Sequence, residues 1–158
     1  MPTPCRLKTP LADELLLSAC TASEALSQLG EATLTVLSDK PNIAPDDLLG
    51  KAVTVTFAFS DDGKRHHHGY VTRFTQGGFE GGRHVYEMTV QPWLWLLTRT
   101  ADCRIFQDMS VPDIVKAVFA DHPVAHSKFK LFRSYRKWGY CVQYRETDFN
   151  FVSRLMEQ

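Results

Sequence analysis

The feature that most constrains the fold is a strictly alternating segment in the first half of the chain. Its apolar members alternate with threonine or alanine, in the order Val53, Thr54, Val55, Thr56, Phe57, Ala58, Phe59. Successive side chains of a β-strand point to opposite faces, so this order predicts a strand with one buried face. Asp61-Asp62-Gly63 follows, and an Asp-Gly pair favours a tight hairpin turn. The chain is therefore expected to build antiparallel β-structure.

Further strands are expected on both sides of this segment. One precedes it at Thr33–Leu37, and two follow, from about Arg65 to Thr75 and from His84 to Val90. The glycine-rich stretch at 77–82 between the last two is expected to be a flexible hairpin loop. Gln91-Pro92 ends the ladder because proline has no amide hydrogen to donate. The sequence thus predicts an antiparallel meander.

The segments outside the meander are expected to be short. Residues 11–29 favour a helix by propensity, although Leu15–Leu17 also fits a buried strand. A single helical turn is predicted at 45–49. In the second half, Ser110 is expected to cap a helix over 110–121, and Thr147 to start one over 147–158. Short strands are predicted at 129–132 and 140–144.

Composition excludes several classes of protein. Eighteen basic and eighteen acidic residues cancel in 158 residues, which argues against a nucleic-acid partner or attraction to an anionic membrane. The segment at the N-terminus does not resemble a signal peptide, and no apolar run reaches the ~18 residues of a membrane-spanning helix. The cysteines have no C-x-x-C spacing and are expected to be reduced thiols; they are Cys5, Cys20, Cys103 and Cys141. Synthesis in the cytoplasm, without stable membrane insertion, is expected.

Candidate catalytic or metal-binding residues are few. His66 and His68 would lie on the same face of a strand, but two histidines alone make a poor zinc site. The glycine-rich stretch at 77–82 lacks the helix N-terminus that phosphate sites use. Asp61 and Asp62 are turn residues, and Cys141 in a strand is a small core residue before it is a nucleophile. We therefore expect no catalytic residue, no cofactor and no metal.

Two aromatic groups stand out as possible contact surfaces. Basic and aromatic residues interleave near the C-terminus, in the order Arg133, Tyr135, Arg136, Lys137, Trp138. This mixture fits a solvated loop or a protein interface better than a nucleic-acid site, given the neutral chain. Trp93 and Trp95 alternate with leucines, so both are expected on the same side, first as core residues and second as a subunit contact.

Several short motifs occur in an order that resembles the first part of VgrG, the spike protein of type VI secretion systems. The resemblance extends from about residue 26 onward and matches only loosely before that. Its motifs are Leu48-Leu49-Gly50-Lys51, His68-Gly69-Tyr70-Val71, Pro92-Trp93-Leu94-Trp95-Leu96-Leu97, Arg104-Ile105-Phe106-Gln107, Val111-Pro112-Asp113-Ile114-Val115, Tyr140-Cys141-Val142-Gln143-Tyr144-Arg145-Glu146-Thr147-Asp148-Phe149 and Phe151-Val152-Ser153-Arg154-Leu155.

The resemblance implies a mainly β fold with small α-helices (α+β), built from antiparallel β-barrel-like modules of the phage-tail hub type. Residues 1–100 would form the first hub module. Residues 101–158 would start the second, truncated at the C-terminus, since no stop signal follows the last helix. The implied function is structural: a platform that joins the Hcp tube hexamer to a piercing spike.

The implied partners are other VgrG subunits in a trimer, and a PAAR tip and effectors through parts of the spike beyond this chain. Export through the type VI apparatus without a signal peptide is implied as well. Two alternatives stay open. One is the baseplate hub of a prophage contractile tail, and the other is a metal-dependent hydrolase that would use His66, His68 and an acidic partner.

Overall fold

The computed structural model describes residues 5–59 and 63–157. The chain divides into two compact units, Met1–Pro92 and Trp93–Gln158. The expected turn at Asp61 and Asp62 falls outside the described residues. The hub modules inferred from the resemblance, 1–100 and 101–158, stay a prediction. The expected fold class is confirmed, because the protein is mainly antiparallel β-structure with a few short helices.

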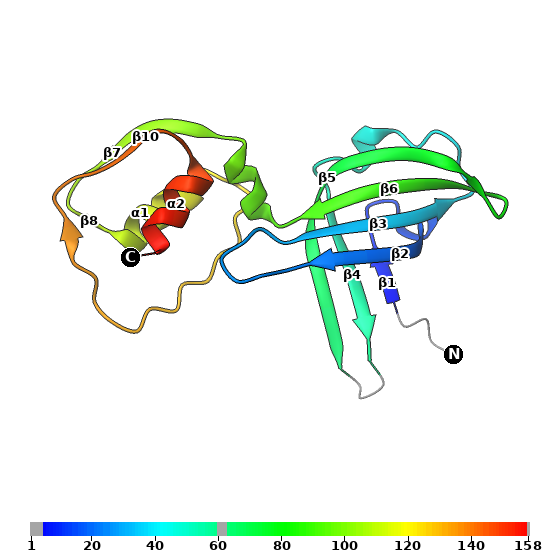
Figure 1. The fold of residues 1–158 in the computed structure, drawn as a ribbon, viewed down its shortest axis with the longest axis horizontal. Coiled ribbons are helices and arrows are strands. Elements are labelled where there is room, and N and C mark those ends of the chain that lie inside the picture. Colours follow the sequence, from blue (N-terminus) through cyan, green and yellow to red (C-terminus); the bar gives the residue numbers. More distant parts are fainter. Residues whose placement is uncertain (1–4, 60–62, 158) are drawn as a thin grey trace. The chain divides into compact units, whose positions relative to one another are not determined.

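The first unit is one antiparallel sheet of six strands in the order β1-β4-β5-β6-β3-β2 (Figure 1). The two end strands, β1 and β2, also contact each other, so the sheet is curled. Two 3₁₀ turns accompany it, at Ala12–Glu14 and at Pro45–Asp47, the latter inside the predicted helical turn. The strands are β1 (Cys5–Lys8), β2 (Leu16–Ser23), β3 (Glu31–Ser38), β4 (Ala52–Ala58), β5 (Lys64–Glu80) and β6 (Arg83–Gln91).

The concave face of the sheet holds the core of the first unit. Val53 and Val55 of β4 are each 1% exposed, as the alternation predicted. Tyr86 of β6 is fully buried and stacks on Phe74 with ring centroids 5.3 Å apart. Its hydroxyl donates a hydrogen bond to the Lys40 carbonyl oxygen at 2.8 Å and accepts one from the Ile43 amide at 3.3 Å. This phenol therefore ties the loop after β3 to the sheet.

The longest strand, β5, changes partner along its length. Residues 64–70 pair with β4, and residues 70–80 pair with β6. Gly69 lies at the change, where a Cβ atom would fall 2.4 Å from the Gln91 carbonyl oxygen, so only glycine fits. The predicted loop at 77–82 is wrong in extent. Residues 77–80 continue the strand, and only Gly81 and Gly82, with φ of 55° and 83°, form the turn.

The helix that propensity favoured over residues 11–29 is wrong. The alternative, a buried strand at Leu15–Leu17, is correct in part, because a strand begins at Leu16 but Leu16 is 45% exposed. Residues 16–23 form β2 and pair with β3 along its whole length. Helix propensities differ by only about 0.7 kcal/mol per ordinary residue, so a pairing that satisfies backbone groups outweighs them. A helix would also have needed an apolar stripe, yet Leu26 is 96% exposed. Leu15, just before β2, is buried in the sheet's core.

The second unit packs two helices against a short ladder. The strands β7 and β10 pair antiparallel, and β8 pairs with β9. Its core includes the fully buried side chains Leu97, Ile114, Val118 and Phe151. The elements are a 3₁₀ helix at Trp93–Thr98, β7 (Ala101–Phe106), β8 (Met109–Ser110), α1 (Val111–Ala120), β9 (Lys137–Trp138), β10 (Cys141–Thr147) and α2 (Asp148–Met156).

Both predicted helices of the second unit are confirmed. Thr147 caps α2, because its hydroxyl oxygen accepts a hydrogen bond from the Asn150 amide at 3.1 Å. Ser110 stands at the N-cap position of α1, but its hydroxyl donates to the Asp113 carboxylate at 2.6 Å instead of accepting from the backbone. None of the helices within 5–59 and 63–157 is both long and apolar enough to cross a membrane.

Two local predictions in this unit are wrong. Residues 129–132 form no strand and belong to an irregular segment. Trp93 and Trp95 do not alternate on one side, since they lie on a 3₁₀ helix with three residues per turn. Trp93 meets Phe119 edge to face with centroids 4.9 Å apart, while Trp95 lies under Arg99.

Candidate functional site

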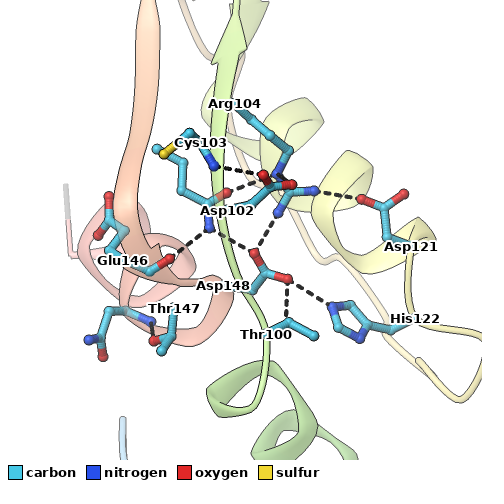
Figure 2. Close-up of polar contacts among 11 residues, drawn as sticks. Thr100, Asp102, Cys103, Arg104, Asp121, His122, Glu146, Thr147 and Asp148 are labelled. Carbon is cyan, nitrogen blue, oxygen red and sulfur yellow. Dashed lines mark hydrogen bonds and ion pairs between the residues drawn. The ribbon is translucent and has the colours of Figure 1, made fainter.

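A cluster of polar residues around Asp148 is the most connected feature of the second unit (Figure 2). Asp148 is the first residue of α2 and its side chain is 6% exposed. One carboxylate oxygen accepts hydrogen bonds from Arg104 at 2.6 Å and from Gln143 at 2.7 Å. The other accepts from Thr100 at 2.8 Å and faces the His122 ring nitrogen at 3.2 Å. Each carboxylate oxygen thus has two polar partners.

These contacts join elements that are far apart in the sequence. Arg104 comes from β7, Gln143 from β10 and His122 from the segment after α1. The backbone amide of Asp148 also donates to the Thr100 carbonyl oxygen at 3.0 Å. One carboxylate at the start of α2 therefore holds both strands of the ladder and the end of α1.

The charge of Asp148 is stabilised by its surroundings. Burial by itself would raise the pKa of this carboxyl group. Hydrogen bonds from Gln143, Thr100 and His122, with the positive charge of Arg104, outweigh burial and lower the pKa below its ordinary value. The group is accordingly ionised at neutral pH.

Arg104 is the other hub of the cluster. Its guanidinium contacts Asp121 at 2.6 Å and Asp102 at 3.5 Å, besides Asp148, and it donates to the Gln143 side-chain oxygen at 2.9 Å. Gln143, fully buried, uses its amide to bridge Asp148 and the Glu146 carbonyl oxygen. No buried side-chain nitrogen or oxygen in the described part of the chain lacks a partner.

This arrangement suits a structural clamp better than a catalytic centre. An ionised carboxylate offers about four acceptor positions, and those of Asp148 are occupied by protein groups. A general base needs a free lone pair within reach of a substrate proton. A buried, fully bonded charge instead fixes the geometry of the elements that supply its partners.

Sequence reasoning did not single out this cluster. Arg104, Gln143 and Asp148 all lie inside motifs that carry the family resemblance, but nothing in one sequence pairs residues some forty positions apart. The one local signal was a carboxylate in the first turn of a helix beginning after Thr147, a place that favours negative charge.

The predicted basic and aromatic patch lies on a groove of about 710 Å³ in the second unit. Arg133, Tyr135, Arg136 and Trp138 line it, with Arg133 stacked on Tyr135 and Arg136 on Trp138. The floor comes from α1, residues 127–131 and the end of α2. Four lining residues are basic and none is acidic. Arginine and aromatic side chains on an apolar floor are typical of protein contact surfaces.

The remaining candidates do not converge on a site. His66 and His68 bond to Thr56 and Thr54 across the β4–β5 pair, at 2.9 and 2.8 Å. Among the residues that the structure describes, no three histidine, cysteine or acidic side chains are grouped to hold a metal. Cys141 is buried in the core of the second unit, and burial raises the pKa of its thiol. Asp61 and Asp62 lie outside the described residues.

Comparison with known proteins gives a consistent result. A family model for the phage tail baseplate hub (GPD) matches residues 23–158. The type VI secretion system spike protein VgrG1b of Pseudomonas aeruginosa is 47% identical over 97% of this chain, and VgrG1c of the same organism is 48% identical over 95%. The chain spans 21% of the length of each of these relatives.

A solved structure agrees in fold. The E. coli c3393 protein, a component of the type VI secretion system with structural similarity to the T4 bacteriophage tail proteins gp27 and gp5, superposes with a TM-score of 0.83 and 26% identity. The match covers 96% of this chain and 42% of that one. The chain is a VgrG-like region and belongs to the phage tail baseplate hub family.

Proposed function

We propose that this chain is a structural hub module of a type VI secretion spike, and that it joins the Hcp tube to the piercing part of the spike. The observation that supports this most is the match of nearly the whole chain, in sequence and in fold, to type VI spike components. We propose no enzymatic activity for it.

The geometry fits a part that must keep its shape. A curled sheet of six strands forms the first unit, and a bonded carboxylate fixes the second. Cooperative hydrogen-bond networks of this kind resist local opening. In this proposal the sheet and the Asp148 cluster carry load, and no side chain needs to react.

The partners that follow from the proposal are the Hcp tube hexamer and other spike subunits in a trimer. A PAAR tip and effectors would attach through the further length that the spike relatives have. The chain would be made in the cytoplasm and leave through the type VI apparatus without a signal peptide.

Co-sedimentation with assembled Hcp rings tests the docking role. The chain would be used alone and fused to a trimeric coiled coil, and the coiled coil by itself is the control. Gly69→Ala and Gly78→Ala form a matched pair. The first places a methyl group against the backbone of β6, while at Gly78 nothing lies within 4 Å of the added carbon. Binding by the fused chain and its Gly78→Ala form, lost in Gly69→Ala, supports a folded docking hub. No binding by any form removes tube docking.

A second candidate is the baseplate hub of a contractile phage tail, which the phage hub family model favours. The two differ in the tube that they would meet. Repeating the sedimentation with rings of a phage tail tube protein distinguishes them, since a type VI hub should prefer Hcp.

A further inference from the structure

The two end strands of the curled sheet meet. β1 and β2 stand at opposite ends of the strand order, yet they contact each other. Backbone hydrogen bonds join neighbours along the rest of the sheet, whereas no ladder joins β1 to β2 in the described residues. This seam is where the sheet remains open.

Each of these two strands carries one cysteine. Cys5 begins β1 opposite Phe57, and Cys20 lies in β2 opposite Leu34. Cross-strand partners point to the same face of a sheet. Leu34 is a fully buried core residue and Phe57 packs on the same core, so both thiols point into the curled sheet. Both cysteines pack against this core cluster.

The surroundings of both thiols raise their pKa. Burial raises the pKa of Cys20, and the negative charge of a Cys5 thiolate raises it further. Burial raises the pKa of Cys5 as well. Both cysteines are free, and each is only partly buried, so a small reagent can reach them.

We propose that Cys5 and Cys20 form an oxidation site, at which a small-molecule disulfide converts the two thiols into one intrachain disulfide across the seam. One thiolate attacks the reagent and releases its first half as a thiol. The other thiolate then attacks the mixed disulfide and releases the second half. Two electrons and two protons pass from the protein to the reagent, and one sulfur–sulfur bond replaces another.

The bond would close the sheet covalently at its open seam. It constrains the unfolded chain by a loop of about 15 residues, which stabilises the folded first unit. The raised pKa of each thiol keeps it protonated at neutral pH, and only the thiolate reacts. Formation of the disulfide is therefore slow at pH 7 and faster towards pH 9. This inference does not depend on docking to a tube.

The test uses the whole chain with Cys103→Ser, because the exposed Cys103 would otherwise link two molecules. Folded protein is incubated with glutathione disulfide at pH 8.5, then digested with trypsin without reduction. The expected product is a peptide pair joining residues 1–6 to residues 9–51, since trypsin does not cleave between Lys40 and Pro41. It should carry the mass of both peptides less two hydrogens. The melting temperature of the oxidised protein should rise by at least about 5 °C.

A matched variant, Cys20→Ser in the same background, should gain only glutathione on Cys5 and show no rise in melting temperature. Circular dichroism before oxidation checks that both proteins are folded. The proposal is overturned if folded protein gives glutathione adducts at Cys5 and Cys20 without the linked peptide, or if the link forms only in urea.

Discussion

Replacing Asp148 by alanine should largely unfold the second unit. The change removes a carboxylate that accepts hydrogen bonds from Arg104, Gln143 and Thr100. Arg104, whose side chain is 21% exposed, would keep the Gln143 side-chain oxygen and the exposed carboxylates of Asp121 and Asp102, and the fully buried Gln143 would lose a partner. Breaking a buried ion pair on one side costs about 3–5 kcal/mol.

That loss is comparable to the whole stability of such a unit. A unit of roughly 65 residues has a free energy of unfolding of about 3–10 kcal/mol. With a urea slope of about 1 kcal/mol per molar, the midpoint would fall by about 3–5 M. The isosteric change Asp148→Asn keeps an acceptor for Arg104 and a polar group facing Thr100. It loses the charge and replaces the oxygen that accepts from Thr100 by an NH2 donor, so we expect a fall of about 1–2 M.

Tryptophan fluorescence isolates the effect. All three tryptophans of the chain, Trp93, Trp95 and Trp138, belong to the second unit, whereas circular dichroism reports on both units. Urea titrations of wild type, Asp148→Ala and Asp148→Asn should show the graded loss in fluorescence. Val55→Ala, in the core of the first unit, is the control that should alter the dichroism. A fluorescence midpoint within about 0.5 M of wild type for Asp148→Ala would refute the clamp.

Three more predictions follow from the same structure. The folded-state pKa of Asp148 is lowered, so its stabilisation is present above the unfolded value of about 3.9 and lost as pH falls through the folded value. The urea midpoints of wild type and Asp148→Asn should therefore begin to approach each other below about pH 4, and the difference should be lost once the pH is below the folded-state pKa. Tyr86→Phe leaves two backbone groups of residues 40–43 without the hydroxyl and should cost about 1–2 kcal/mol, measured by dichroism in urea. Gly69→Ala should lower the melting temperature of the first unit markedly, and Gly78→Ala should leave it nearly unchanged.

The local sequence pattern predicted those strands and helices whose buried side chains recur at the period of the element itself. The strand at 52–58 and the helices after Ser110 and Thr147 were recognisable because the spacing of their apolar residues agrees with what packs on them. The Thr147 cap is also present, whereas Ser110 makes no capping hydrogen bond and Phe59 lies outside the strand, 55% exposed. Residues 16–23 were different. Their alanine, leucine and serine content favours a helix weakly, and what makes them a strand is β3, whose paired residues are 8 to 21 positions away.

The Asp148 cluster could not have been assembled from one sequence for a similar reason. Its members come from β7, β10, α2 and the end of α1, and only the fold places them around one carboxylate. The basic and aromatic patch was recognisable, since its residues all lie within positions 133–138. The apolar floor beneath the patch could not be predicted, because it forms only when α1 and α2 pack in the folded unit.

The partner change along β5 bears on how the first unit would respond to mechanical force. This strand is seventeen residues long, roughly 55 Å when extended, and it borders β4 with one part and β6 with the other. A pull along the strand loads its rows of hydrogen bonds together, in shear. A pull across the sheet would break them one after another, as in unzipping. The first unit should therefore be stiffest along β5, and the direction of tension would decide whether the sheet yields as a block or row by row.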